Sequence, residues 1–387
     1  MKLAMIGFGQ AGGKVVDQFL EYDRNNNSNI VRAAVAVNTA KADLLGLENI
    51  PQDQRVLIGQ SRVKGHGVGA DNELGAEIAE EDIDEVQGAI DNIPVHEVDA
   101  FLVVAGQGGG TGSGGAPVLA KHLKRIYTEP VYGLGSLPGS DEGGIYTLNA
   151  ARSLQTFVRE VDNLIVFDND AWRKTGESVK TGYAERNEEL ARRLGVLFSA
   201  GEVTNGRVAE TVVDASEVIN TLASGGVSTI GYAASPLERR KGGLLSRIGG
   251  RRPDDDTETD TVNQVSSLIR RATLGRLTLP CEVKGTERAL VVVSGPPEAL
   301  SRRGIEHGRK WLEAETGTME IRGGDAPTES EYVAAVVLLS GVTAVPRIKE
   351  LQAVAIEAQR DFGERDAGSE ARLADLLDTD DRLETLF

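Results

Sequence analysis

Two glycine-rich segments of this 387-residue chain have the composition of anion-binding loops. GFGQAG places Gly7, Gly9 and Gly12 directly after the apolar residues KLAMI and before a helical pattern. The second segment, at 108–114, reads GGGTGSG and follows another apolar run. Glycines let backbone N–H groups close on an anion, and a helix that begins there adds the positive end of its dipole. Two such loops predict a site for the phosphates of one nucleotide.

The first segment alone also fits the GxGxxG pattern of a dinucleotide site, but its context does not. Such a site needs an acidic residue at the end of the second strand to hold the ribose hydroxyls. The apolar run 30–38 ends instead in Asn38, Thr39 and Ala40. The sequence also lacks GxxxxGK[ST], so a Walker-type phosphate loop is excluded. An NAD(P)-binding oxidoreductase stays an alternative from another class, favoured by GFGQAG but leaving the second glycine loop unexplained.

Apolar runs and helical patterns alternate along the first half of the chain. Each strand candidate is followed by a segment about as long as one crossover unit, which predicts an α/β fold with a parallel sheet covered on both faces. The strand candidates are 2–6, 30–38, 99–105, 131–137 and 163–169. The glycine loops follow the first and the third of them, so both belong to the edge where these strands end.

A long helical segment at 184–199 separates this pattern from a second one. The later strand candidates are 228–234, 287–295 and 332–341, with helices near 261–272 and 297–315. We interpret this half as a second α+β domain. The predicted parts are a nucleotide-binding domain at 1–183, a central helix and connector at 184–206, a second domain at 207–360 and an acidic C-terminal tail at 361–387.

The composition limits the partners and the compartment. The chain has 42 Lys and Arg against 59 Asp and Glu, a net charge of −17 that argues against nucleic acid as the main partner. Only 12 of the basic residues are Lys, which together with the acidity indicates adaptation to high salt; an ordinary acidic cytoplasmic protein is the alternative. Cys281 is alone, so no intrachain disulfide forms. No apolar run reaches the roughly 20 residues that span a bilayer. We expect a location in the cytoplasm, including the inner face of the cell envelope.

Two segments have an irregular pattern. The segment 235–260 gathers six basic residues before an acidic run, and it is either a solvated loop or a contact surface. These basic residues are Arg239, Arg240, Lys241, Arg247, Arg251 and Arg252. The tail 361–387 ends in LADLLDTDDRLETLF, which either docks on a partner or stays unstructured.

These motifs resemble a known family. GGGTGSG is similar to the signature of the tubulin/FtsZ superfamily, and GQAGGK at 9–14 resembles the first loop of tubulin more than the bacterial version. MKLAMIGFGQAGGK, VVAGQGGGTGSGG and the acidic composition together resemble the archaeal CetZ branch. The resemblance covers nearly the whole chain. It implies a GTPase that assembles head to tail into filaments and controls cell shape, and an FtsZ-like polymer of cell division is the alternative.

The resemblance also implies roles for individual residues. Glu142 would hold the ribose, and Asn169 and Asn187 would bind the guanine edge, since an amide both donates and accepts hydrogen bonds. Mg²⁺ is expected between the β- and γ-phosphates, ligated mostly by phosphate and water. The γ-phosphate would contact the loop with Gly69, Ala70 and Asp71. The phosphates would lie on Gln10, Ala11, Gly12, Gly13, Lys14, Gly108, Gly109, Gly110, Thr111 and Gly112.

Hydrolysis needs a group that orients or deprotonates a water, and the glycine loops supply none. In the superfamily this group comes from the next subunit, at the place that VVDASE (212–217) occupies here. Asp214 and Glu217 are the catalytic candidates, because residues three apart at the start of a helix share one side. The alternative is a helix cap and a surface acid. Val212 and Ala40 depart from the bacterial pattern, which affects the expected water network rather than the reaction class.

A site divided between two copies makes turnover depend on assembly. We expect an open filament, with lateral sheets or a partner contact through 235–260 and a tail-binding or membrane adaptor protein as a further partner. Because acidic subunits repel one another less at high ionic strength, we expect polymerisation to require high salt. A module that binds nucleotide without hydrolysing it is a third hypothesis.

Overall fold

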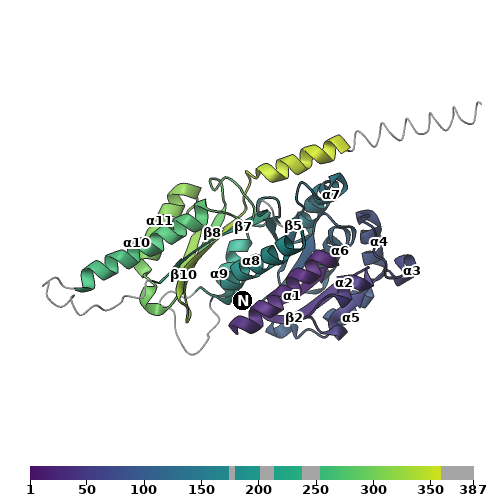
Figure 1. Cartoon of the computed structure of the whole chain (residues 1–387), viewed down its shortest axis with the longest axis horizontal. Coiled ribbons are helices and arrows are strands. Elements are labelled where there is room, and N and C mark those ends of the chain that lie inside the picture. Colours follow the sequence, from purple (N-terminus) through teal and green to yellow (C-terminus); the bar gives the residue numbers. More distant parts are fainter. Residues whose placement is uncertain (174–178, 201–212, 238–252, 359–387) are drawn as a thin grey trace, which may run out of the picture.

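One mixed sheet of ten strands runs through the computed structural model, which describes residues 1–173, 179–200, 213–237 and 253–358 (Figure 1). The strand order is β3-β2-β1-β4-β5-β6-β7-β10-β8-β9. The strands are β1 (Leu3–Phe8), β2 (Val31–Asn38), β3 (Arg55–Leu57), β4 (Ala100–Gly106), β5 (Val131–Leu137), β6 (Asn163–Asp168), β7 (Val227–Pro236), β8 (Arg288–Gly295), β9 (Ile321–Pro327) and β10 (Tyr332–Ser340).

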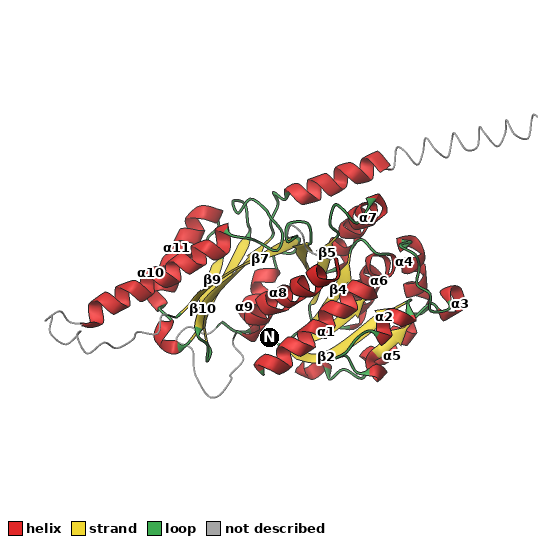
Figure 2. Cartoon of the chain, in the orientation of Figure 1, coloured by secondary structure: helices red, strands yellow, loops and turns green. Residues whose placement is uncertain are grey.

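The first six strands are parallel, as the alternation of apolar runs predicts. Helices cover both faces of this half of the sheet, in agreement with the predicted α/β class (Figure 2). The α-helices are α1 (Gly9–Asn26), α2 (Lys41–Leu45), α3 (Gln60–Val63), α4 (Asn72–Glu81), α5 (Ile83–Ile90), α6 (Gly110–Ile126), α7 (Gly144–Glu160) and α8 (Val179–Ser199), and short 3-10 turns lie at Gln52–Gln54 and Val95–Glu97.

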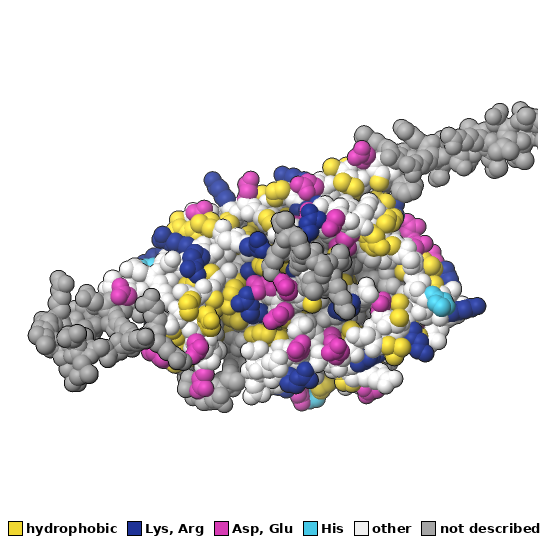
Figure 3. Space-filling model, viewed as in Figure 1, with side chains coloured by type: hydrophobic (Ala, Val, Ile, Leu, Met, Phe, Trp, Pro, Cys, Tyr) yellow, Lys and Arg dark blue, Asp and Glu magenta, His cyan; other side chains and the backbone are white. Residues whose placement is uncertain are grey.

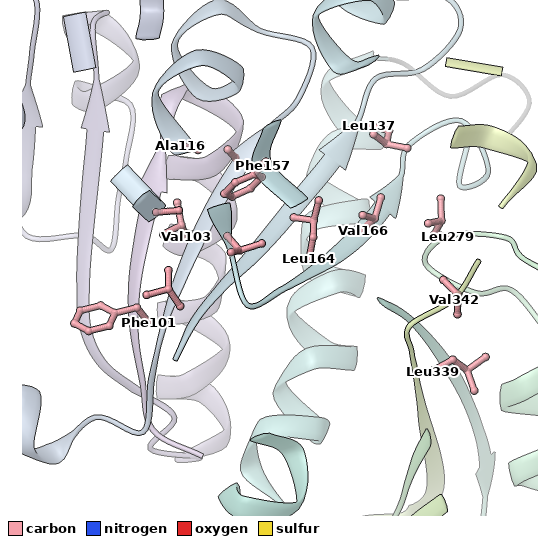
Figure 4. Packing of buried hydrophobic residues seen from close by; sticks show 14 of the residues in the cluster. Phe101, Val103, Ala116, Leu137, Phe157, Leu164, Val166, Leu279, Leu339 and Val342 are labelled. Atoms are coloured by element: carbon pink, nitrogen blue, oxygen red, sulfur yellow. The ribbon is translucent and has the colours of Figure 1, made fainter. Parts of the chain in front are cut away.

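The buried apolar residues form two clusters, one on each face of the sheet. Along β1, Ile6 and Phe8 belong to the cluster under α4 to α7, whereas Leu3 and Met5 belong to the one under α1 and α8. This alternation follows from the two-residue period of a strand. Figure 4 shows the first cluster, in which Phe101, Phe157 and Leu164 of the parallel half pack in the same layer as Leu339 of the antiparallel half.

The second half of the sheet is largely antiparallel. β10 lies antiparallel between β7 and β8, and β9 adds to β8 in parallel. α10 and α11 cover one face of this half, and α9 packs on the other. The helices are α9 (Ala215–Leu222), α10 (Pro253–Leu274) and α11 (Arg302–Thr316), with a 3-10 turn at Pro297–Ala299 and a further helix at 346–358.

The two halves meet at β6 and β7, which pair in parallel over only two positions, Leu164 with Val227 and Ile165 with Ser228. A buried polar group closes this junction: the Asn163 side chain donates to the Ser340 hydroxyl (2.9 Å) and accepts from the Ser228 hydroxyl (2.6 Å). Buried polar groups that satisfy one another this way favour one relative arrangement of their elements.

The structure corrects the predicted extent of one segment. The stretch 235–260 was expected to be irregular, but β7 continues to Pro236 and α10 begins at Pro253. Pro253 suits the first position of a helix, because the N–H that proline lacks has no partner there. The six basic residues at 239–252 and the tail 361–387 lie outside the described residues, so their predicted contacts stay predictions.

The surface carries both signs of charge in alternation. On the face in Figure 3, Lys and Arg side chains lie among Asp and Glu side chains over both halves of the sheet. Among the described residues, every helix falls short of the length and apolar character that crossing a membrane requires.

Candidate functional site

A cleft of about 690 Å³ lies where β1, β4, β5 and β6 end. This is the edge of a parallel sheet at which α/β proteins bind ligands. All the predicted nucleotide-binding residues line the cleft except Gly12, Gly13 and Asp71. The predicted residues that line it are Gln10, Ala11, Lys14, Gly69, Ala70, Gly108, Gly109, Gly110, Thr111, Gly112, Glu142, Asn169 and Asn187.

Two helices begin at the cleft without a side-chain cap. α1 starts after Phe8 and α6 after Gly109, and in neither case does a described side chain accept from the first N–H groups or an acidic residue stand in the first turn. The side chains of Asp71, Asp214 and Ser301 cap α4, α9 and α11, whereas α2, α3, α5 and α7 also begin without a side-chain cap. Uncapped N–H groups at two helix N-termini favour a bound anion at this point.

The glycines of the loops have two different roles. A Cβ on Gly12 would lie 2.1 Å from the Val104 carbonyl oxygen, and one on Gly112 would lie 2.9 Å from the Phe8 carbonyl oxygen. These glycines let α1 and α6 pack closely on the strands. A Cβ on Gly109 would meet nothing within 4 Å, and since Gly109 lines the cleft, that open space is part of the cleft. Gly12 and Gly13 thus pack against residues beneath the cleft: Gly12 faces the Val104 carbonyl, and Gly13 faces the Leu47 side chain.

Hydrogen bonds join the two glycine loops to the end of β2. We call this part of the cleft its phosphate end. Asp43 accepts from the Gln10 amide (2.9 Å) and from the Asn38 amide (3.2 Å), which joins the first glycine loop to the end of β2. The hydroxyls of Thr39 and Thr111 lie 2.7 Å apart and join β2 to the second loop. Sequence reasoning missed Asp43; its place in the helical turn after β2 was the available signal.

The other end of the cleft carries the predicted ribose and base residues. Glu142 accepts from the Gly139 N–H (2.7 Å) and from the Tyr183 hydroxyl. Burial, together with the hydrogen bond to Glu142, raises the pKa of Tyr183 above its usual range. Asn169 follows β6, and its backbone N–H donates to the Leu137 carbonyl (3.2 Å). The sequence analysis missed Tyr183 because the helix was predicted to begin at 184, whereas α8 begins at Val179 and includes this tyrosine.

The loop before α4 has a strained backbone. Gly67, Gly69 and Ala70 all have positive φ, with Ala70 at 66°. A left-handed alanine costs about 1 kcal/mol or more and persists only where its surroundings hold it. The Asn149 side chain supplies this support by donating to the Ala70 carbonyl (2.7 Å) and to the Gly108 carbonyl (3.0 Å), so it links this loop to the second glycine loop. Asp71 lies beside the cleft, where its carboxylate accepts from Leu74 N–H (3.0 Å).

The acidic candidates lie at the opposite edge of the sheet. Asp214 caps α9, and its carboxylate accepts from the Glu217 N–H (3.1 Å) and the Ser216 hydroxyl (2.5 Å). The Ser216 bond lowers the pKa of Asp214. Glu217 Oε2 lies 2.9 Å from Arg322 Nε as an ion pair, without the alignment of a hydrogen bond.

Hydrogen bonds between β6 and the end of α9 show where Asp214 and Glu217 lie relative to the cleft. Asn163 is the first residue of β6, and its amide donates to the carbonyls of Leu222, the last residue of α9 (3.0 Å), and Gly225 (2.9 Å). Asn169 lines the cleft just beyond the other end of β6. The pair therefore does not contact the cleft of its own chain, and α8, a 21-residue helix about 30 Å long, runs between the two regions.

The residues of the cleft fit a hydrated magnesium ion. The described residues contain no group of three or more His, Cys, Asp or Glu that could hold a metal. Mg²⁺ bound to a nucleotide takes most of its ligands from phosphates and water and one or two from protein oxygens. The Asp43 carboxylate and the Gln10 amide oxygen supply such atoms at the phosphate end, next to the uncapped helices.

Two family models match this chain, one over each half. Residues 2–177 match the Tubulin/FtsZ family GTPase domain, and residues 176–357 match the Tubulin-like CetZ, C-terminal domain. The chain is 77% identical over 371 residues to the Tubulin-like protein CetZ1 of Haloferax volcanii, with 94% of each chain covered. The chain belongs to the CetZ family of tubulin-like proteins, as the sequence resemblance predicted.

Two solved structures agree with this assignment. The GDP-bound monomer of Haloferax volcanii CetZ1 is 72% identical, has a TM-score of 0.84 and covers 93% of this chain and all of its own. The GTPγS-bound protofilament of Haloferax volcanii CetZ2 is 46% identical, has a TM-score of 0.83 and covers 94% of this chain and all of its own. The two-part tubulin/FtsZ fold is therefore confirmed.

Proposed function

We propose that this chain binds GTP in the cleft, assembles head to tail and hydrolyses GTP where the cleft of one copy meets α9 of the next. The observation that carries the proposal is the separation of Asp214 and Glu217 from the cleft by the length of β6. The cleft binds the nucleotide, and Asp214 and Glu217 supply carboxylates that lie away from it. When copies stack in one direction, the cleft of one copy meets the carboxylate pair of the next. Such a contact is heterologous and forms an open filament.

Each part of the cleft has a role in this proposal. The uncapped N-termini of α1 and α6 and the side chain of Lys14 hold the phosphates, Glu142 holds the ribose, and the amides of Asn169 and Asn187 bind the guanine edge. The Asp43 carboxylate and the Gln10 amide oxygen would help to hold a hydrated Mg²⁺, which would neutralise part of the phosphate charge. The strained loop at Gly69 and Ala70, beside Asp71, responds to the γ-phosphate, so that GTP favours the filament and hydrolysis weakens it.

In the next copy, Glu217 orients or deprotonates the water that attacks the γ-phosphate, and Asp214 fixes the start of α9 through its cap. Two relatives support this proposal, because CetZ1 of Haloferax volcanii has been solved as a GDP-bound monomer and CetZ2 as a GTPγS-bound protofilament. The cellular role that we propose is control of cell shape. A division role is the alternative, and loss of the gene separates the two by giving either altered shape with normal division or undivided cells.

The decisive experiment measures GTP hydrolysis per subunit against protein concentration in KCl of about 3 M, where repulsion between acidic subunits is screened. A cooperative onset that coincides with light scattering is expected if copies complete the site. Turnover per subunit that is independent of concentration contradicts it. Tight binding of NAD without binding of GTP would support the oxidoreductase alternative instead, and GTP binding with no turnover in polymers would support a non-hydrolysing module.

A further inference from the structure

Arg347, the second residue of the helix 346–358, reaches from the second half of the chain to the base end of the cleft. Its Nη2 donates to the Pro138 carbonyl (3.0 Å), and its Nε lies 3.7 Å from Asp168 Oδ1. Only 13% of the Arg347 side chain is exposed. Figure 1 shows this last described helix, drawn in yellow, extending from the second half toward α7.

Both partners of Arg347 adjoin residues of the cleft. Pro138 lines the cleft and begins the loop that carries Glu142, and Asp168 directly precedes Asn169. The Asp168 side chain is 5% exposed, and its Oδ1 accepts from the Asp170 N–H (3.1 Å). Through Pro138 and Asp168, Arg347 therefore contacts the start of the loop that carries Glu142 and the residue before Asn169 at the same time.

The two loops are also joined to each other. Asp170 accepts from the N–H (3.2 Å) and the hydroxyl (3.0 Å) of Ser140. Burial raises the pKa of Asp168, and the Arg347 cation opposes that rise. A buried carboxylate that loses its cation either takes up a proton or moves toward water. Either response disturbs the bond to Asp170 and, through Ser140, the loop that ends at Glu142.

We infer that Arg347 is a positioning residue for recognition of the guanosine part of the nucleotide. It fixes Asn169 and Glu142 through Asp168 and Pro138, without touching the ligand itself. This inference deepens the proposed function and rests on it. It also makes the orientation of the last described helix a condition for selective nucleotide binding, because the same side chain belongs to that helix.

The test is replacement of Arg347 by Met, which keeps most of the volume and removes the charge and the donors. We expect the Kd for GTP to rise about tenfold, which corresponds to the loss of about 1.4 kcal/mol, and the preference for GTP over ATP to fall by a similar factor. We expect the kcat at saturating GTP to change less than twofold, because neither the phosphate end nor α9 is altered. R347K should restore part of the affinity, since it returns a point charge without the planar fork.

Two further variants separate positioning from folding. Asp168→Asn in the R347M chain removes the buried charge and keeps an acceptor for Asp170, so it should recover part of the selectivity and the Tm together. Arg302→Met is the matched control, because Arg302 is an exposed arginine at the start of α11 that pairs with Glu306 on its own helix. This variant should change neither the preference for GTP over ATP nor the Tm.

The outcomes are distinct. Failure of the unaltered protein to bind GTP overturns the proposed function itself. Normal GTP binding by the unaltered protein, with an unchanged GTP preference in folded R347M, overturns only the role of Arg347. A lower Tm in R347M with unchanged selectivity in the folded fraction assigns Arg347 to stability alone and also overturns the inference.

Discussion

The cleft and the acidic pair at α9 are built in opposite ways. The phosphate end of the cleft is formed largely by backbone: two uncapped helix N-termini, glycines without side chains and a loop with positive φ. The pair at α9 consists of side chains, and the N–H groups there are already capped by Asp214. The first region can bind an anion, and its carboxylates, Asp43 and Glu142, already accept hydrogen bonds from neighbouring residues of the cleft. In the proposed mechanism the second region supplies the group that activates water.

Under the proposed mechanism, this difference explains why the two regions would work together only between different copies of the chain. Glu217 pairs with Arg322 at the start of β9, on the edge of the sheet away from the cleft. In the folded chain, α8 and the sheet hold the two edges apart. In the proposed filament, stacking copies in one direction brings Glu217 of one copy to the cleft of the next at every contact. Substitutions in each region test this difference between the cleft and α9.

Replacing Glu217 by Ala should lower GTP turnover in polymers about a hundredfold or more, since positioned general bases contribute about that much. GTP affinity should stay unchanged, because the residue lies outside the cleft. Steady-state phosphate release and equilibrium binding of GTP measure the two effects. Unchanged turnover under polymerising conditions would remove Glu217 from the mechanism.

A mixing experiment sharpens this prediction. Glu217→Ala keeps a working cleft, and a variant that does not bind GTP, such as Gly109→Arg, keeps a working α9. In an equal mixture about a quarter of the head-to-tail contacts join one intact cleft to one intact α9. Activity should therefore reappear although neither variant is active alone. Its absence from mixed polymers would argue that one chain holds the whole site.

The glycines separate binding from folding. Gly109→Ala places a methyl group in the open space of the cleft, so we expect the Kd for GTP to rise about tenfold with an unchanged Tm. Gly12→Ala places a methyl group 2.1 Å from the Val104 carbonyl oxygen, and overpacking of this kind costs about 1–3 kcal/mol of stability. Thermal melting and GTP titration of both variants check this. The same Tm loss in both would show that Gly109 is a packing residue too.

The ion pair between Arg322 and Glu217 predicts a smaller effect. Arg322→Met leaves the carboxylate without the cation that orients it, so kcat in polymers should fall about threefold to tenfold, while GTP affinity stays the same. Arg322→Lys should restore part of the rate. A rate that rises in Arg322→Met would instead indicate that Arg322 restrains Glu217.

The smallest effect is on how the Tm depends on pH in acid. The hydrogen bond from Ser216 lowers the folded-state pKa of Asp214, so the cap stabilises the fold above the ordinary pKa of an aspartate, and this contribution is lost as pH falls through the lowered value. Asp214→Asn keeps a good cap that does not titrate. The difference in Tm between the two proteins should thus be constant near pH 7 and should shrink or reverse below pH 4. A constant difference at every pH would contradict the shift.

Most strands of the first half were predictable, because each is a short apolar run followed by a helical period. β3 (Arg55–Leu57) was not among the strand candidates, since it is only three residues long and pairs with β2 alone. β9 was not predicted, since IRGGDAP has two glycines and a proline and becomes a strand only by pairing with β8. The start of α10 at Pro253 was also missed, because a charged segment after a basic cluster has the composition of a loop.

The two glycine loops, their places after strands and the family that they identify could be recognised in the sequence, because these depend on residue types at fixed local spacing. The folded structure was needed to show which glycines line the open cleft and which pack, that Asp43 and Tyr183 line the cleft and Arg347 adjoins it, and that Glu217 lies at the other edge of the sheet. Those facts depend on contacts between residues far apart in the chain, and no local pattern encodes such contacts.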